Sequence, residues 1–186
     1  MKYLAGYTPA LQESVRRLLA EDALGPLLRK RYIGIHDIRT DRALYVFASE
    51  LKGEFMRKAE PLAKAVFDNK LHVIRNALGT HTTIARVQGN KLKVKREIRV
   101  ASLFKEVPLE WLRMIVVHEL AHSKVKDHDK HFYALCTHME PDYHQFELDL
   151  RLYLTLLEAG GQSPWQTATC APMQDSGQPG NDVSIR

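Results

Sequence analysis

The amino-acid sequence predicts an α+β fold, in which a small antiparallel sheet packs on one strongly apolar helix and further helices precede and follow it. Two patterns predict this fold. Apolar residues recur at helical spacing over residues 8–67 and again from residue 108, whereas they alternate with polar residues within 71–102. The length of 186 residues suits a single domain. We place that domain at residues 1–160 and expect a disordered tail at 161–186.

The N-terminal part of the domain is predicted to be helical. Residues 8–30 carry an apolar stripe behind Thr8, which can cap a helix, and the Gly25-Pro26 pair interrupts the run. Residues 41–67 predict a longer helix, which Pro61 kinks or splits because proline lacks an amide donor. The stripe residues are Leu11, Val15, Leu18 and Leu19 in the first helix, and Leu44, Phe47, Ala48, Leu51, Phe55 and Met56 in the second.

The central part, residues 71–102, is predicted to form the sheet. Its strand candidates are residues 71–74, 82–88 and 91–102, and the Gly89-Asn90 pair between the last two suits a tight hairpin turn. One face of the last strand is expected to be buried and the other to face water. The buried set is Leu92, Val94, Ile98 and Val100, and the wet set is Lys93, Lys95, Glu97 and Arg99.

The C-terminal part returns to helical spacing. Residues 108–123 predict a helix that begins near Pro108 and is apolar enough to lie in the core. Two more helices are predicted within 129–158, at residues 129–139 and 142–158. Beyond them the chain is rich in Gly, Pro, Ser, Gln and Asn, and Trp165 is its one candidate anchor.

Composition bounds the setting in which the protein works. Its two cysteines, Cys136 and Cys170, are too few for a disulfide framework, so a reducing compartment is expected. We find no apolar run of the length of a signal peptide or a membrane span. The sequence therefore predicts a cytoplasmic protein without a membrane partner. The net charge of +5 permits an anionic partner but does not require one, and the oligomeric state is left open.

Residues 118–122 read His-Glu-Leu-Ala-His and carry the predicted chemistry. His118 and His122 lie four residues apart, so on a helix both imidazoles share one face and can reach the same zinc ion. Glu119 is rotated by about 100° from His118, so it can act as general base on a water at the metal without ligating it. The pattern predicts a metal-dependent hydrolase that uses Zn²⁺ or another divalent metal.

A catalytic zinc ion usually takes a third protein ligand and leaves one position for water. His128 is favoured because it follows His122 after a gap short enough to close over the same ion. His131 and a glutamate of the following helices, Glu140 or Glu147, remain alternatives. Tyr143, His144 and Arg151 are candidates to donate a hydrogen bond to the developing oxyanion.

The His118-Glu-Leu-Ala-His122 segment, with His128, Phe132 and Pro141-Asp-Tyr143 after it, resembles the YgjP-like metallopeptidase family. These are minimal zincins related to SprT-type proteases. The resemblance implies a zincin-like fold, zinc bound by the three histidines, and Glu119 as the catalytic base.

Two stretches depart from the family pattern. Residues 78–86 stand where most members carry Trp-Gly-Ser-Cys, and Asp127-His128-Asp129 replaces the usual Asn-His-Ser. Some bacterial members that resemble this chain are described as UTP pyrophosphatases, so the resemblance implies the chemistry more firmly than the substrate.

Three readings of the substrate follow. The leading one is peptide or protein hydrolysis, with residues 96–101 as a strand that could pair with an extended peptide. The second is hydrolysis of UTP or another nucleoside triphosphate. The third, ranked last, is a nucleic-acid-associated protease or a DNA-binding protein. Both of the latter need cations for phosphate groups. The candidate cations are Arg75, Arg86, Lys91, Lys93, Lys95, Arg96 and Arg99.

Overall fold

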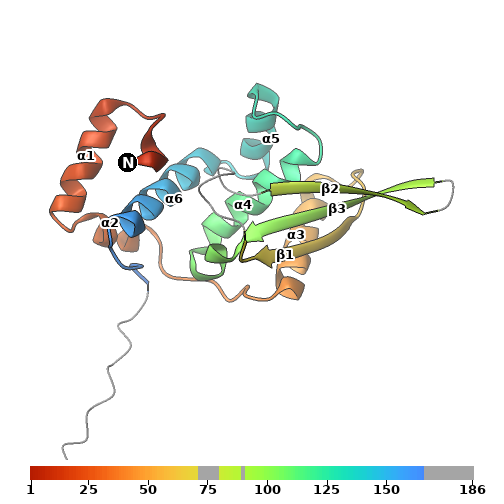
Figure 1. Cartoon of the computed structure of the whole chain (residues 1–186), viewed down its shortest axis with the longest axis horizontal. Helices are drawn as coiled ribbons and strands as arrows, with labels where there is room; N and C mark the ends of the chain where they lie inside the picture. The colour runs from red at the N-terminus through yellow and green to blue at the C-terminus, as the bar shows by residue number, and fades with distance from the viewer. Residues whose placement is uncertain (71–79, 89–90, 166–186) are drawn as a thin grey trace, which may run out of the picture.

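The computed structural model describes residues 1–70, 80–88 and 91–165, and the side chains of residues 80–88 and 91–96 are not described. Three strands and a layer of helices surround one central helix, α4 (Figure 1). In chain order the elements are η1 (Lys2–Leu4), α1 (Pro9–Ala20), α2 (Leu24–Arg31), α3 (Asp41–Phe55), β1 (Leu62–Asp68), β2 (Thr80–Gln88), β3 (Lys91–Ala101), η2 (Ser102–Glu106), α4 (Leu109–His122), α5 (Lys130–Met139) and α6 (Tyr143–Glu158).

The helix predicted over 8–30 is two helices in the structure. Thr8 caps α1 as expected, because its side chain accepts a hydrogen bond from the amide of Leu11 at 3.3 Å. The helical conformation is interrupted at Asp22, which adopts a left-handed conformation with φ of 50°. The break therefore precedes Gly25-Pro26, and Pro26 lies in the first turn of α2, where its missing amide proton has no intrahelical acceptor to lose.

The helix predicted over 41–67 is wrong beyond Phe55. Thr40 caps α3, which ends at Phe55, and the chain after Pro61 becomes strand β1. Alanine and lysine in this stretch favour a helix locally. Pairing with β3 overrides that preference, because β1 then gains backbone hydrogen bonds and packing that a solvent-exposed helix end could not supply.

The sheet has the strand order β1-β3-β2 and is mixed. The antiparallel hairpin of β2 and β3 is confirmed, with Gln88 opposite Lys91. The prediction of a wholly antiparallel sheet is wrong, because β1 runs parallel to β3. The strand predicted at residues 71–74 and the turn residues 89–90 lie outside the described residues.

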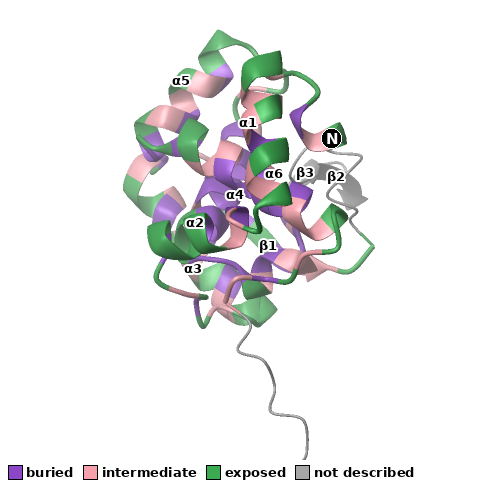
Figure 2. Ribbon diagram, turned by 90° about the vertical axis from the view of Figure 1, so that its left-hand side faces the viewer, coloured by how far each residue is buried: buried purple, intermediate pink, exposed green. Residues whose placement is uncertain are grey.

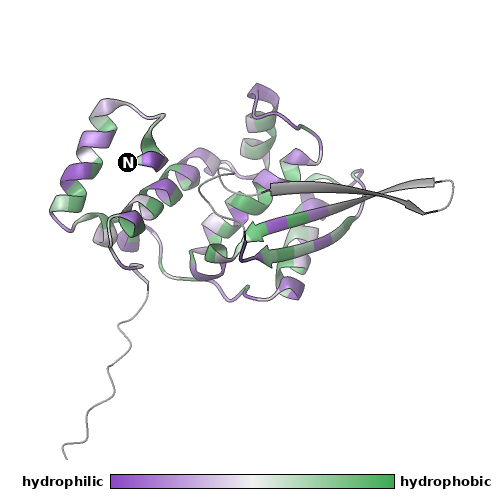
Figure 3. Cartoon of the chain, viewed as in Figure 1, coloured by the Kyte–Doolittle hydropathy of each residue, from purple (hydrophilic) through white to green (hydrophobic). Residues whose placement is uncertain are grey.

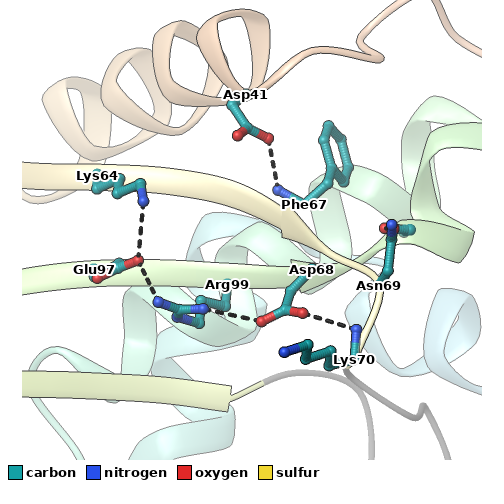
Figure 4. A network of polar contacts seen from close by, with 9 residues as sticks. Asp41, Lys64, Phe67, Asp68, Asn69, Lys70, Glu97 and Arg99 are labelled. Carbon is teal, nitrogen blue, oxygen red and sulfur yellow. Dashed lines mark hydrogen bonds and ion pairs between the residues drawn. The ribbon is translucent and has the colours of Figure 1, made fainter.

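The described part of β3 shows the predicted alternation only in part. Ile98 and Val100 are buried against the core, as expected. Glu97 is also buried, at 8% exposure, because ion pairs cover its carboxylate, with Arg99 at 2.9 Å and Lys64 at 3.7 Å (Figure 4). Arg99 also reaches Asp68 at 3.0 Å, so this network ties β1 to β3 across the outer face of the sheet (Figure 4).

Helix α4 forms the centre of the core. Its residues from Trp111 to Ala121 are almost all buried, and Figure 2 shows it as a purple helix enclosed by green outer elements. Figure 3 colours α4 largely as hydrophobic, whereas α1 alternates between hydrophilic and hydrophobic residues. A helix that is apolar on all sides must be surrounded, and α4 contacts α3, α5, α6 and the sheet.

The C-terminal helices α5 and α6 begin within one residue of their predicted starts. The predicted tail is wrong for its first five residues, 161–165, which remain attached to the domain. Trp165 donates a hydrogen bond to the carbonyl of Tyr32 at 3.1 Å, and its ring lies 5.3 Å from that of Trp111. Residues 166–186 lie outside the described residues.

None of the helices in the described ranges combines the length and apolar composition that crossing a bilayer would require.

Candidate metal centre

The structure brings His118, His122 and His128 together at the C-terminal end of α4. His118 and His122 occupy the last turns of the helix, and His128 comes from the loop that leads into α5. Their exposure rises in that order, from buried through intermediate to exposed. The cluster of three histidines therefore lies in the core at His118 and faces solvent at His128.

The three Nε2 atoms form a nearly equilateral triangle. The Nε2 atoms of His118 and His122 are 3.2 Å apart, and that of His128 lies 3.1 Å from each. A tetrahedral zinc site with Zn–N bonds of about 2.0–2.1 Å places its nitrogen ligands about 3.3–3.4 Å from one another. The triangle thus fits a divalent ion with three imidazole ligands and one side open to solvent.

The opposite ring nitrogens of His118 and His122 have partners that orient these two imidazoles. Nδ1 of His118 lies 2.7 Å from the hydroxyl oxygen of Tyr143, and Nδ1 of His122 lies 3.1 Å from the carbonyl oxygen of Val125. Phe132, fully buried, packs its ring 4.6–4.9 Å from all three imidazole centroids. The ring of Phe132 contacts all three imidazoles and limits how far each of them can rotate.

Burial keeps His118 and His122 in the neutral form that binds metals. Burial first, and then the neighbouring His122 and His128, lowers the pKa of His118 to about 3. Burial also lowers the pKa of His122. A neutral ring has a free nitrogen lone pair, so at neutral pH little proton competition opposes metal binding at these two residues.

Glu119 is fully buried, and neither of its carboxylate oxygens has a hydrogen-bond partner among the described residues. Burial raises its pKa to about 8. The carboxyl group adjoins a cavity of about 10 Å³, room for roughly one water molecule, whose lining includes Lys52 and Ile98. A buried carboxyl group without a partner is costly for folding and is typical of a functional site.

The other candidate ligands are engaged elsewhere. Glu140 forms an ion pair with Arg113 at 2.6 Å, and Glu147 forms one with Arg151 at 2.7 Å. The side chain of His131 is 87% exposed and lies beside Asp129. Of the residues considered for the third ligand position, the structure brings only His128 to the other two histidines.

The candidate oxyanion donors are also placed by their contacts. Tyr143 is fully buried and bonded to His118, and Arg151 is bonded to Glu147 and to the carbonyl of Tyr3. His144 is exposed, with its ring 5.3 Å from that of Tyr133. Sequence reasoning missed the contact of Tyr143 with His118 and the support from Phe132. The only signal for either was their place in the family pattern.

Of the candidate phosphate-binding cations, only Arg99 has a described side chain, and it is held between Glu97 and Asp68. The side chains of the other six candidates lie outside the described part of the chain.

Comparison with known proteins agrees with this site. The family model described as "YgjP-like, metallopeptidase domain" matches residues 54–153, which include the three histidines, Glu119 and Tyr143. The chain belongs to the YgjP-like family. Its members carry a metallopeptidase-type domain, and this YgjP-like protein is accordingly a metal-dependent hydrolase.

A curated relative of this YgjP-like protein is named "UTP pyrophosphatase" and comes from Escherichia coli (strain K12). It is 56% identical over 160 residues, which cover 86% of this chain and 96% of the relative. Comparison with solved structures finds no significant match. The family match begins at residue 54, so helices α1 and α2 lie outside it.

Proposed function

We propose that this YgjP-like protein is a zinc-dependent hydrolase that cleaves UTP into UMP and pyrophosphate. The observation that carries the hydrolase assignment is the triangle of three imidazole nitrogens, together with a fully buried carboxyl group on α4, the helix that carries two of them, which has no hydrogen-bond partner among the described residues. The relative named UTP pyrophosphatase supports the substrate, because it is 56% identical and the match covers 96% of its length.

In this proposal His118, His122 and His128 hold the ion in a minimal zincin arrangement. The ion supplies Lewis acidity, which lowers the pKa of water and stabilises negative charge on phosphoryl oxygens. Glu119 takes the proton from the attacking water and passes it on as the bond to pyrophosphate breaks. Its burial keeps the carboxyl group out of bulk solvent and raises its pKa, which makes it a stronger base once ionised.

The triphosphate needs cationic partners, and we place two of them in the loop between His122 and His128. Lys124 and Lys126 are exposed in this loop, Lys124 two residues after His122 and Lys126 two residues before His128. Lys52, which lines the cavity at Glu119, is a third. Its ammonium group donates to the carbonyl of Ala59 at 2.8 Å and retains two further donors.

Peptide hydrolysis is the second candidate. The family's description as a metallopeptidase domain favours it, as does the spacing of His118, Glu119 and His122. Against it stands the position of β3, whose residues 96–101 were expected to pair with a peptide. These residues pair with β1 on one side, and residues 96–99 also pair with β2 on the other, so the expected peptide edge is not open. A protease would need another edge.

The nucleic-acid reading has the least support. Arg99, the one candidate cation with a described side chain, is neutralised by two carboxylates.

We propose that the protein acts on its nucleotide in the cytoplasm, where the buried free thiol of Cys136 is kept reduced.

A substrate panel separates these functions. Purified protein is incubated with UTP and with casein, each with and without a chelator, while released pyrophosphate and cleaved peptide are measured. We expect chelator-sensitive pyrophosphate release from UTP and no casein cleavage. Chelator-sensitive casein cleavage with inert UTP would reverse the order of the two candidates. The variant Glu119→Gln, which removes the proposed base, is measured in the same panel. Its matched control is Glu110→Gln, because Glu110 lies on the exposed first turn of the same helix.

A further inference from the structure

We infer that Tyr143 is a positioning residue of the metal centre, whose hydroxyl accepts a hydrogen bond from Nδ1–H of His118 and thereby directs Nε2 at the ion. The inference rests on the proposed metal site. It concerns a residue of α6, a helix that contributes no ligand to the triangle.

The direction of this hydrogen bond follows from ligand chemistry. Nε2 of His118 lies in the triangle and must be unprotonated to bind a metal. A neutral imidazole then carries its proton on Nδ1, which makes Nδ1 a donor. Since Nδ1 lies 2.7 Å from the hydroxyl oxygen of Tyr143, that oxygen must accept. A single hydrogen bond therefore selects the tautomer that the ion requires.

The two rings are arranged for such a bond. The imidazole of His118 and the phenol ring of Tyr143 are inclined by only 12°, with their centroids 6.3 Å apart. Because the hydroxyl oxygen lies only 2.7 Å from Nδ1, a centroid separation of 6.3 Å requires the two rings to lie end to end, so the N–H, which points outward in the ring plane, meets the oxygen near its own axis. A ring stacked face to face over His118 could not receive this proton.

The hydroxyl of Tyr143 also interacts with the buried thiol of Cys136 on α5. Burial raises the pKa of that thiol, and Tyr143 lowers it by a smaller amount. Tyr143 can thus accept from His118 and donate to the sulfur of Cys136, which satisfies both the donor and the acceptor capacity of a fully buried hydroxyl. The resulting chain from α4 through α6 to α5 couples the orientation of His118 to the packing of all three helices.

The position of Tyr143 is itself fixed at the start of α6. Its amide donates to the carbonyl of Glu140 at 3.0 Å, and Glu140 is held by Arg113 at 2.6 Å. Arg113 belongs to α4, the helix that also carries His118. Tyr143 is therefore connected to α4 twice, through its backbone by way of Glu140 and Arg113, and through its hydroxyl by way of His118. These two connections leave the hydroxyl little freedom to move away from His118.

A neutral phenol differs from the carboxylate that often supports a metal-binding histidine. A carboxylate raises the basicity of the ligand and adds negative charge near the ion. A tyrosine hydroxyl orients the ring without that charge, so the bound ion retains more of its Lewis acidity. This is the property that hydrolysis demands of the ion.

The test compares Tyr143→Phe with Tyr153→Phe. Tyr153 is a buried tyrosine of the same helix that packs against Trp111 and Trp165, so its substitution costs a hydroxyl away from the histidines. Metal-free proteins are titrated with Zn²⁺ against a chromophoric chelator. We expect Tyr143→Phe to weaken zinc binding by about 10–100-fold, the range for lost ligand partners. Tyr153→Phe should bind within about two-fold of the wild type, well inside that range.

Two outcomes are distinguished. If the wild type binds no zinc, the proposed function fails and this inference fails with it. If the wild type binds zinc, His118→Ala abolishes binding and Tyr143→Phe binds as tightly as the wild type, the role of Tyr143 alone is refuted. The visible spectrum of the Co²⁺-loaded proteins is a second readout, and it should change in Tyr143→Phe only.

Nitrogen NMR of the zinc-loaded wild type tests the same inference without any substitution, so misfolding of a variant cannot obscure it. His118 should show the tautomer protonated at Nδ1, with that proton protected from exchange. The tautomer protonated at Nε2, or a rapidly exchanging Nδ1 proton, would overturn the inference.

Discussion

The Nε2 atoms of His118 and His128 lie 3.1 Å apart, although His128 is exposed and belongs to a loop while His118 is buried in the central helix. This contact closes the triangle that the pair on the helix leaves open. It depends on Phe132, whose ring packs 4.9 Å from that of His118 and 4.7 Å from that of His128. The loop between α4 and α5 is thereby folded back over the end of α4.

Replacing His128 by alanine should remove the third ligand. We expect zinc affinity to fall by more than the roughly 10–100-fold that loss of a ligand's partner costs, and hydrolysis to fall with it. His131→Ala is the control, since His131 is a highly exposed histidine three residues further on. Isothermal titration of the metal-free proteins measures both affinities. Equal losses in the two variants would contradict the assignment of His128.

Glu119→Gln should separate metal binding from turnover. The amide is of nearly the same size but cannot accept the proton, so we expect hydrolysis to fall by about 10²–10⁴-fold. Zinc content, measured by elemental analysis, should remain that of the wild type. A variant that keeps its full rate would rule out Glu119 as the base, whichever substrate is used.

The same substitution should stabilise the metal-free fold at neutral pH. Burial raises the pKa of Glu119 from 4.5 to about 8, so between these values the unfolded state has lost a proton that the folded state keeps. The stability of the wild type therefore falls as the pH rises through this window. Urea unfolding at pH 7 with a chelator should show Glu119→Gln more stable by about 2–3 kcal/mol. A less stable variant would contradict the predicted cost of burying this carboxyl group.

His118 should impose the opposite pH dependence, and the Glu119→Gln background removes the contribution of Glu119 from the measurement. Its folded pKa is about 3 against an ordinary value of 6.5, so below pH 6.5 the unfolded state takes up a proton that the folded state does not. Stability should therefore fall on acidification from pH 6.5 toward pH 4.5, by up to about 1.4 kcal/mol per pH unit. Adding His118→Asn should reduce this slope in chelator-treated protein, while the slope that His122 contributes remains. An unchanged slope would assign the dependence to other groups.

An ion pair between the half-exposed Arg31 and the buried Asp149 should affect stability without affecting metal binding. Asp149 is fully buried and accepts from Arg31 at 2.5 and 2.7 Å, from Tyr32 at 2.6 Å and from Gln145 at 3.1 Å. Arg31→Met leaves this carboxylate without its cation. Since the Arg31 side chain is 44% exposed, we expect a loss of about 1–3 kcal/mol, below the range for a fully buried pair.

Thermal unfolding of Arg31→Met and of Arg29→Met, an exposed arginine on the same helix, measures this effect. Zinc affinity should be unchanged in both variants. A similar loss of stability in Arg29→Met would show that helix α2, rather than the pair with Asp149, is the source.

Local patterns were sufficient where the geometry is local. Two histidines four residues apart on a helix must share a face, so the pairing of His118 with His122 required no knowledge of the fold. The alternation of residues 82–88 and 91–102 likewise predicted the β2–β3 hairpin. By contrast, residues 62–68 contain good helix formers, and only their pairing with β3 makes them a strand.

The sequence by itself predicted a metal-dependent hydrolase, because the spacing of His118, Glu119 and His122 is typical of a helix that carries two metal ligands and a general base. Only the tertiary structure decided that His128 completes the triangle, while Glu140 and Glu147 are paired with arginines. It also decided that Tyr143 supports His118. These choices depend on contacts between distant segments, and such contacts are set by packing around α4 rather than by the residues next to each ligand.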